Sequence, residues 1–349
     1  MRLVGTTSRK EVTITLGIWL VLLIGAIVGL LVLRSQATDI ITRIYYVNVS
    51  SGQKAEVLYA EAEKNARALL KKYDAHTQEG AQPKPAAATH IPPDDPQLKR
   101  CLTLFEEAMT VDGRPQFSPE RTFYYELLGQ VYEAAQNKPA ELLARANALM
   151  SQGNTTDTLE YIARAQNAAP KSPEPLVLLA QVRLKQQDTA AAADAIHKIY
   201  ESMTPTPDAR WVQAELLTAE GKTSGAVAEL EKAVAERPHD LRYRIDLGNA
   251  FERAGNLGNA IKVMAAGLGH GGWYDAHYLH VYGIYLMNTK DYAEAIRVLD
   301  QADQLAPYSG DIQLSLARAY NKAGKPRQAA SALKRAAEIK PELQTQILD

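Results

Sequence analysis

Apolar residues in the segment 139–343 follow a helical period, and the whole pattern recurs about every 34 residues. Within each copy, apolar positions fall at i, i+3, i+4 and i+7 on either side of a polar break that contains Gly or Asp. This arrangement predicts two antiparallel helices per copy. The phase expected at the crossing of the two helices carries a small residue in every copy: Ala146, Ala180, Ala214, Gly248, Gly283 and Ala317.

The end of each copy carries a second signal. Proline recurs there as Pro170, Pro238, Pro307 and Pro341, with Pro205 one residue late and Gly272 in place of proline once. Proline lacks a backbone N–H and disfavours helical geometry in the residue before it. We therefore expect the second helix of each pair to stop at this point and the chain to begin another pair.

This pattern resembles the tetratricopeptide repeat, a helix-turn-helix of about 34 residues with Leu-Gly, Tyr, Ala and Pro at fixed phases. Residues 246–264 (DLGNAFERAGNLGNAIKVM) and 291–307 (DYAEAIRVLDQADQLAP) match it closely, whereas the first copy has Arg145 and Thr158 where Leu and Ala are usual. The resemblance implies an all-α solenoid. Its six repeats would span residues 139–172, 173–206, 207–240, 241–275, 276–309 and 310–343, followed by a tail at 344–349.

Proteins of this family hold peptides or partner proteins in a concave groove lined by the first helix of each pair, and they rarely do chemistry. The resemblance therefore implies a non-enzymatic scaffold or adaptor without a cofactor. The family's groove phases correspond here to Trp211, Glu215, Ile245, Asn249, Arg253, His277, His280, Ile284, Arg318 and Lys322, with Glu174, Val177, Gln181, Lys185 and Leu314 as further members. Trp211 and His280 replace the Lys or Asn of chaperone-tail binders, which argues against an acidic C-terminal tail as ligand.

Residues 12–33 form a stretch of 22 residues without a charge. At 1.5 Å per residue such a helix spans the bilayer core of about 30 Å. A cleaved signal peptide is the alternative, since residues 35–37 (Ser-Gln-Ala) would serve as a cleavage site, but its apolar region is typically about 7 to 15 residues long. We therefore predict an uncleaved transmembrane helix in contact with the lipid bilayer.

Basic residues near this helix set its expected orientation. Arg2, Arg9 and Lys10 precede it, whereas Arg34 and Arg43 follow it. This excess predicts a cytoplasmic N-terminal flank (residues 1–11) and periplasmic repeats at a bacterial inner membrane, where the protein would assist assembly or secretion. The alternative is an import-receptor-like protein with cytosolic repeats. Within the helix, Gly25 and Gly29 form a G-x-x-x-G motif that could support a homodimer, although Gly is common in membrane helices.

Three segments connect the membrane helix to the repeats. Residues 34–75 contain an Ala-, Lys- and Glu-rich helical pattern and predict a stalk helix. Residues 76–96 hold five prolines and few large apolar residues, which is typical of a flexible linker. Residues 97–138 again have helical periodicity, and we expect them to form a cap or a degenerate repeat.

Charge and cysteine content exclude several classes of function. Lys and Arg total 39 against 40 Asp and Glu, so the chain lacks the basic excess of a nucleic-acid-binding protein. Cys101 is the single cysteine, which excludes an intramolecular disulfide framework and a cysteine-rich zinc site.

Two motifs in the fourth and fifth copies could carry chemistry. Gly267, Gly269 and Gly272 satisfy G-x-G-x-x-G, but they follow a predicted helix rather than a strand, so we interpret them as a loop. His277 and His280 share a helix face close to His270, which leaves a metal-binding or catalytic domain centred on residues 270–280 as an alternative function. Diagnostic spacing of a fourth ligand is missing, and we assign no metal or catalytic residue.

Overall fold

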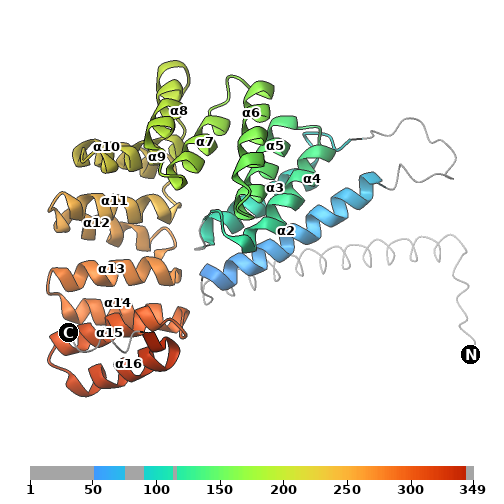
Figure 1. The fold of residues 1–349 in the computed structure, drawn as a ribbon. Coiled ribbons are helices and arrows are strands. Elements are labelled where there is room, and N and C mark those ends of the chain that lie inside the picture. Colours follow the sequence, from blue (N-terminus) through green and yellow to red (C-terminus); the bar gives the residue numbers. More distant parts are fainter. Residues whose placement is uncertain (1–50, 75–89, 113–115, 343–349) are drawn as a thin grey trace, which may run out of the picture. The chain divides into compact units, whose positions relative to one another are not determined.

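A computed structural model describes residues 51–74, 90–112 and 116–342 of the chain, and within these ranges every regular element is a helix (Figure 1). The predicted membrane segment 12–33, with Gly25 and Gly29, lies outside the described residues, as do most of the predicted linker and the tail. Among the described helices, none combines the length and the apolar character needed to cross a membrane.

Twelve of the helices form six consecutive antiparallel pairs, and each predicted repeat contains one pair. The first pair begins at Lys138, one residue before the predicted start of the first repeat. The two helices of each pair pack closely against each other, and each pair also contacts the next. The pairs are α5 (Lys138–Ser151) with α6 (Thr155–Ala168), α7 (Glu174–Lys185) with α8 (Thr189–Ser202), α9 (Pro207–Ala219) with α10 (Thr223–Glu236), α11 (Leu241–Arg253) with α12 (Leu257–Leu268), α13 (Ala276–Asn288) with α14 (Tyr292–Leu305), and α15 (Gly310–Lys322) with α16 (Pro326–Ile339).

A left-handed residue followed by a capping residue makes the turn within most pairs. In the fourth repeat, Gly255 has a φ of 72°, and the side chain of Asn256 then accepts a hydrogen bond from the backbone N–H of Asn259 at 3.2 Å. Such a cap satisfies one of the N–H groups that the first turn of a helix leaves unpaired. Asp188 and Asp291 cap α8 and α14 in the same way.

Proline ends the second helices as the sequence predicts. The C-cap residues Ala169, Arg237, Ala306 and Lys340 each stand directly before a proline. In the fourth repeat, α12 instead runs into the glycine-rich loop and a short 3-10 helix, η2 (Gly272–Tyr274). A methyl group on Gly267 would lie 2.0 Å from the hydroxyl of Tyr278, so glycine there makes room for a buried tyrosine. The G-x-G-x-x-G motif therefore serves packing.

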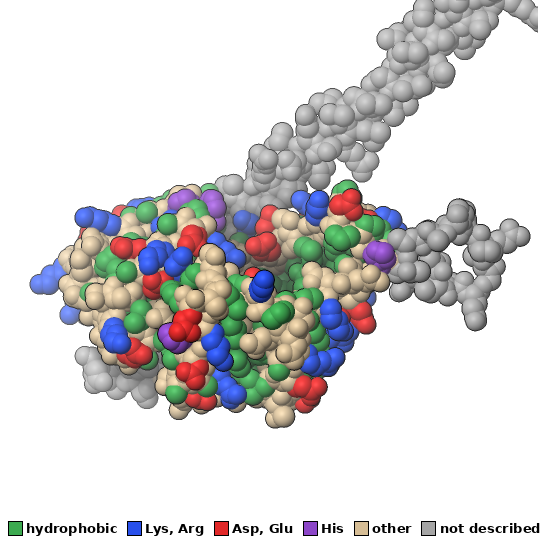
Figure 2. Space-filling model, turned by 90° about the horizontal axis from the view of Figure 1, so that it is seen from above, with side chains coloured by type: hydrophobic (Ala, Val, Ile, Leu, Met, Phe, Trp, Pro, Cys, Tyr) green, Lys and Arg blue, Asp and Glu red, His purple; other side chains and the backbone are tan. Residues whose placement is uncertain are grey.

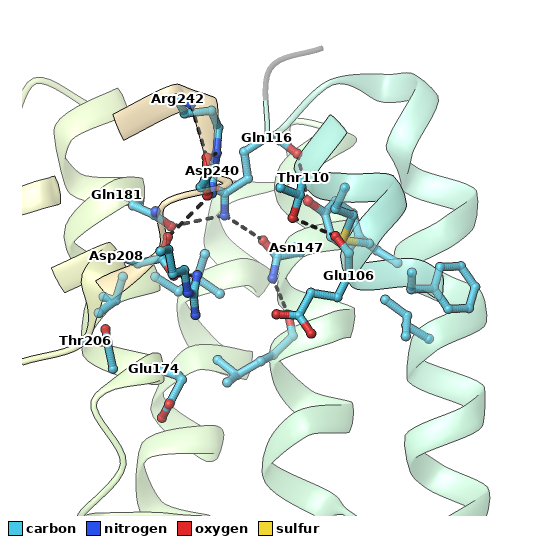
Figure 3. A pocket seen from close by; sticks show the side chains of 18 of the residues that line it. Glu106, Thr110, Gln116, Asn147, Glu174, Gln181, Thr206, Asp208, Asp240 and Arg242 are labelled. Atoms are coloured by element: carbon cyan, nitrogen blue, oxygen red, sulfur yellow. Dashed lines mark hydrogen bonds and ion pairs between the residues drawn. The ribbon is translucent and has the colours of Figure 1, made fainter. Parts of the chain in front are cut away.

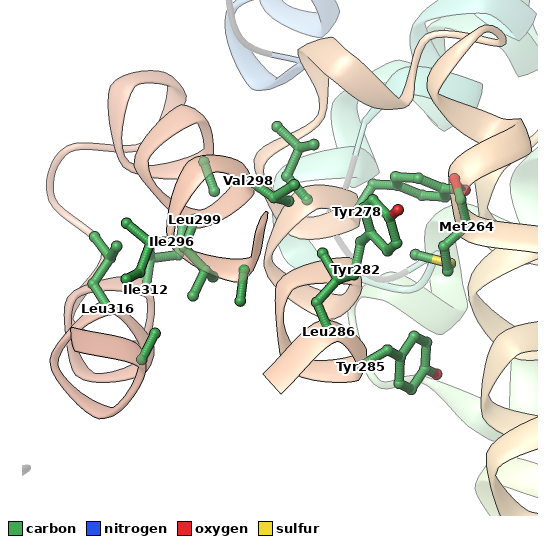
Figure 4. Close-up of a cluster of buried hydrophobic side chains, with 14 of the residues drawn as sticks. Met264, Tyr278, Tyr282, Tyr285, Leu286, Ile296, Val298, Leu299, Ile312 and Leu316 are labelled. Carbon is green, nitrogen blue, oxygen red and sulfur yellow. Dashed lines mark hydrogen bonds between the residues drawn. The ribbon is translucent and has the colours of Figure 1, made fainter. Parts of the chain in front are cut away.

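The small residues lie where the paired helices cross. Ala146 and Ala180 are fully buried, and a methyl group on Gly283 would lie only 2.6 Å from Leu299 on the partner helix. Larger apolar side chains fill the space between pairs and form a continuous core through the last three repeats (Figure 4). Tyr278, Tyr285 and Leu299 are among its most buried members. Each repeat thus depends on its neighbours for a complete core.

Within the described ranges, three α-helices precede the repeats: α2 (Ser51–Asp74), α3 (Pro96–Val111) and α4 (Thr122–Ala134), with a 3-10 turn, η1 (Pro119–Arg121), before α4. The helix expected as a stalk is α2, but it packs along α3 and α4 instead of standing alone. One face of α2 is buried, including Leu58, Tyr59 and Leu69, and the Tyr59 ring stacks on Tyr124 at 3.8 Å. Burial of this apolar face explains why the expected stalk is part of the folded unit.

Candidate protein-binding groove

All ten predicted groove residues lie on the first helices of their pairs. Trp211 and Glu215 lie on α9, and Ile245, Asn249 and Arg253 lie on α11. The other five are divided between α13 and α15: His277, His280, Ile284, Arg318 and Lys322. Glu215, Arg253, His277, Arg318 and Lys322 are exposed, and the other five are partly buried.

A hollow between α9 and α11 brings four of these residues together. Its volume is about 310 Å³, and Trp211, Glu215, Asn249 and Arg253 all line it. Asp246 joins them from α11. One aromatic ring, two acidic groups, a carboxamide and a guanidinium therefore face one space of side-chain size.

Hydrogen bonds fix the orientation of the polar groups in this hollow. The indole Nε1 of Trp211 donates to Oδ2 of Asp246 at 2.7 Å, and Nδ2 of Asn249 donates to Oδ1 of Asp246 at 3.3 Å. The hydroxyl of Tyr285, from α13, donates to Oδ1 of Asn249 at 2.5 Å. This hydrogen-bond network thus joins three successive repeats. Asp246 is its centre, although it lies one position beside the groove phases and the repeat pattern therefore does not single it out.

The two acidic groups influence each other. Burial, reinforced by the negative charge of Asp246, raises the pKa of Glu215 from its ordinary value of 4.5 to about 7. Glu215 nevertheless keeps contact with solvent and lines the hollow. Burial also raises the pKa of Asp246, while the hydrogen bonds from Trp211 and Asn249 oppose that rise. Near neutral pH, Glu215 can therefore act as a donor as well as an acceptor.

The histidines of the fifth repeat do not form a cluster of ligands. Nε2 of His280 lies 2.8 Å from the hydroxyl of Ser315 on α15, and burial lowers the pKa of the imidazole. The ring of His270 packs edge-on against His239 at 4.9 Å. Nowhere in the described ranges do three His, Cys, Asp or Glu side chains gather as they would to hold a metal ion. The region 270–280 thus supplies packing contacts between repeats.

A larger cavity, of about 880 Å³, lies between the N-terminal helices and the first four repeats (Figure 3). Its apolar wall comes from α3 and α4, where Phe105, Tyr125 and Leu128 contribute. Its polar wall comes from the start of α9 and of α11, where Asp208 and Arg242 lie. The groove members Glu174, Val177 and Gln181 line the same cavity.

An ion-pair network stiffens the polar wall. Arg237 donates to Oδ2 of Asp208 at 2.9 Å, and the hydroxyl of Tyr243 donates to Oδ1 of the same carboxylate at 2.8 Å. Arg242 forms two hydrogen bonds with the buried carboxylate of Asp240, at 3.0 and 2.6 Å. Because these charges neutralise one another, the cavity offers polar contacts without a large net charge.

Charges of both signs also mix on the molecular surface. On the face shown in Figure 2, Lys and Arg side chains alternate with Asp and Glu side chains around an area where hydrophobic side chains gather. This distribution agrees with the near balance of charges in the sequence. It suits contact with a protein segment of mixed composition.

Solved structures of helical repeat proteins resemble the described fold. A chain from the APC/C hetero-tetramer Cut9-Hcn1 aligns with a TM-score of 0.52 at 14% identity, covering 70% of this chain and 49% of that one. PilF from Pseudomonas aeruginosa aligns with a TM-score of 0.52 at 16% identity, covering 60% of this chain and 98% of that one. The alignment thus spans about half of the Cut9-Hcn1 chain, and at these identities the likeness concerns the fold alone. No curated protein matches the sequence.

Family models give a direct assignment. Two models, each described as tetratricopeptide repeat, match the region of the helix pairs: one at residues 143–210, 212–276 and 245–310, and the other at residues 286–347. The matched segments together cover more than half of the chain and contain the six helix pairs almost completely. The chain belongs to the tetratricopeptide repeat family.

Proposed function

We propose that this protein is a membrane-tethered scaffold that binds an extended segment of a partner protein along the first helices of its repeats. The hollow between α9 and α11 carries the proposal, because an aromatic ring, hydrogen-bonding groups and a guanidinium converge there. Aromatic and Arg side chains in partly desolvated pockets supply most of the binding energy of protein interfaces. No catalytic role is assigned to any of these residues.

A row of polar side chains suits an extended backbone. Asn147, Gln181, Glu215 and Asn249 occupy the same phase of four successive repeats, 34 residues apart. Each residue of a bound peptide presents one N–H donor and one C=O acceptor. A carboxamide has two N–H donors and two acceptor lone pairs, so Asn249 keeps one of each after its bonds to Asp246 and from Tyr285, and the protonated form of Glu215 also offers a donor and an acceptor. The row can therefore pair with peptide backbone irrespective of the partner's side chains.

Replacement of Arg253 tests this function most cleanly, because its side chain is exposed and lines the hollow. Arg253→Ala should weaken the binding of the partner by about 1 to 3 kcal/mol, with helicity and melting unchanged. The readout is the amount of partner recovered with the full-length, tagged protein in detergent. Lys262→Ala, an exposed cation on the second helix α12, is the matched control and should have no effect. Trp211→Ala should weaken binding too, but it also removes packing against two core clusters and should lower stability.

A different result would place recognition elsewhere. If Arg253→Ala leaves partner recovery unchanged while deletion of residues 34–49 abolishes it, the segment before α2 binds the partner and the groove proposal is wrong. Deletion must stop before α2, since that helix is part of the folded unit.

We also propose that residues 12–33 anchor the protein in a bacterial inner membrane, with the N-terminal flank in the cytoplasm and the repeats in the periplasm. The 22 uncharged residues and the excess of basic residues before them support this proposal. Dimerisation through Gly25 and Gly29 belongs to the same proposal, and replacing both by Leu should abolish self-association of the isolated segment in a membrane reporter assay.

An impermeant thiol reagent separates this orientation from that of an import-receptor-like protein with cytosolic repeats. Cys101 cannot report on it, because its side chain is fully buried and burial raises the pKa of the thiol to about 11. Tyr308 is 87% exposed, so Tyr308→Cys in a Cys101→Ala background places a reactive thiol on the repeats. Labelling in spheroplasts supports periplasmic repeats. Labelling only after lysis supports cytosolic repeats.

A further inference from the structure

The connection between α3 and α4 is fastened at both ends by a buried ion pair. Nε of Arg121 donates to Oδ2 of Asp112 at 3.0 Å, and another guanidinium nitrogen donates to the Asp112 carbonyl at 2.7 Å. The hydroxyl of Tyr59, on α2, donates to the same carboxylate at 3.0 Å. Both charged side chains are about 95% or more buried. Buried pairs of this kind lose much stability when one partner is removed, so the ends of the connection are held firmly in place.

Within this connection, the side chain of Gln116 contacts the polar row of the first two repeats, at Asn147 and Gln181 (Figure 3). Its Nε2 donates to Oδ1 of Asn147 on α5 at 3.3 Å and to Oε1 of Gln181 on α7 at 3.1 Å. The Gln116 carbonyl accepts a hydrogen bond from the hydroxyl of Tyr125 at 3.1 Å. Gln116 therefore already pairs with the side chains expected to bind a partner's backbone in these two repeats.

The next residue, Phe117, occupies the adjoining apolar surface. Its ring packs against a core cluster of α5, α6 and α7 that includes Met150 and Leu178. The ammonium group of Lys185, a predicted groove residue, lies 5.2 Å from the centre of the ring. Contacts of this kind between a cation and an aromatic face are attractive. Phe117 is thus seated as an aromatic side chain of a bound peptide would be.

We propose, on the basis of the groove function above, that Gln116 and Phe117 are an intramolecular ligand of the first two repeats, displaced by a partner segment with an aromatic residue beside a carboxamide. Both residues are only partly buried, unlike the ion pair that fastens the connection. Gln116 also lines the 880 Å³ cavity, which offers space for its displaced side chain. The pair therefore has the exposure that exchange requires, and the Gln116 side chain also has the room.

The chain supplies its own probe for this site. A fluorescein-labelled peptide of residues 111–121 (VDGRPQFSPER) is titrated into the full-length protein in detergent and followed by anisotropy. The variant that empties the site carries Gln116→Ala with Phe117→Ala. Glu120→Ala is its matched control, an exposed residue of the same connection. We expect the emptied variant to bind the peptide at least about tenfold more tightly than the wild type or Glu120→Ala does.

Three further measurements define the site. The same peptide with Phe117→Ala should bind the emptied variant at least about tenfold more weakly, and adding Gln181→Ala to that variant should also weaken binding. Adding Arg253→Ala should leave peptide affinity unchanged. The groove proposal is therefore tested by Arg253→Ala and partner binding, and the present proposal is tested separately by the peptide, so that either can fail without the other. Equal affinity of wild type and emptied variant, or no binding to the emptied variant up to about 1 mM peptide, overturns the proposal.

Loss of the Phe117 ring could also disturb the cluster beneath it. Gln116→Ala alone leaves the ring on the cluster and is the second variant, with helicity and melting recorded for both. It removes the hydrogen bonds to Asn147 and Gln181, so it should bind the peptide more tightly than the wild type does, though less tightly than the emptied variant. Wild-type affinity in a normally folded Gln116→Ala variant overturns the displacement proposal as wild-type affinity of the emptied variant does.

Discussion

Replacing Gly283 with alanine tests how the two helices of a repeat interlock. Gly283 lies on α13, and an added methyl carbon would lie 2.6 Å from Cγ and 2.7 Å from Cδ2 of Leu299 on α14. Carbon atoms in contact prefer separations of about 3.5 to 4.0 Å, so Leu299 would have to move by roughly 1 Å. Leu299 is fully buried in the core of the last three repeats, so its neighbours would have to move with it.

Two opposing effects set the magnitude. Overpacking a buried site costs about 1 to 3 kcal/mol, while alanine is favoured over glycine within a helix by about 0.5 to 1 kcal/mol. We expect Gly283→Ala to lower the free energy of unfolding by about 1 to 2 kcal/mol. Gly258→Ala on α12 is the matched control, because the nearest atom to its new methyl group is 3.9 Å away. That variant should be as stable as the wild type or slightly more stable.

Hydrogen exchange is the appropriate assay, because repeat arrays unfold in parts and a single melting temperature can hide a local change. For each 1.4 kcal/mol lost, amides of α13 and α14 should exchange about tenfold faster, while amides of α7 and α8 should be unaffected. If these amides exchange no faster in Gly283→Ala than in the wild type, Leu299 can move aside without lowering the free energy of unfolding. The recurring small residues would then not be a packing requirement.

Three other changes have clear expected outcomes. The N-cap residue of α16, Lys325, makes no side-chain capping hydrogen bond. Lys325→Asn should supply one worth about 0.5 to 1 kcal/mol and raise the urea midpoint of unfolding. A lower midpoint would mean that the lost contacts of Lys325 outweigh the new cap. Because folding raises the pKa of Glu215, the unfolded chain loses this proton at a lower pH than the folded protein does. The free energy of unfolding of the wild type, relative to that of Glu215→Gln, should therefore fall as pH rises from about 4.5 to about 7. A difference between the two proteins that does not change with pH in urea titrations refutes this. A fragment of residues 50–349 should be folded and soluble, whereas residues 97–349 should aggregate because the faces that α2 covers become exposed; equal light scattering by the two fragments would contradict this.

The repeats were predictable from sequence because helix packing imposes a period on it. Two interlocked helices need a small residue at their crossing and a stop after the second helix. These demands place Ala180 at the position of Ala146, and Pro238 at the position of Pro170, in different copies. The first copy shows how far the pattern extends. Thr158 replaces the usual Ala, yet it is fully buried and donates its hydroxyl proton to the backbone carbonyl of Asn154 at 2.6 Å, so a larger, polar residue also fits this position when its hydroxyl is hydrogen-bonded.

The family's groove phases predicted which residues lie on the first helices but could not reveal their side-chain partners. Trp211 and His280 occupy groove phases, yet each also bonds to a side chain 35 residues later: Asp246 and Ser315 respectively. Such contacts depend on how neighbouring repeats stack, and a pattern within one repeat does not encode them. These two groove positions therefore contribute both to the exposed surface and to the stacking of repeats.

The N-terminal helices and their connection were the least predictable part of the chain, because no repeated copy exists with which to compare them. The Ala-rich pattern of α2 suits an isolated helix as well as a packed one, and Tyr59 reaches its buried partner Asp112 across 53 residues of sequence. Phe117 lies in a connection without periodicity, so its contact with the groove follows only from the fold. A repeat array gains most of its order from local contacts. The partly buried contacts of Gln116 and Phe117 with the first two repeats are therefore the ones that a partner can replace without breaking the buried ion pair of Asp112 and Arg121.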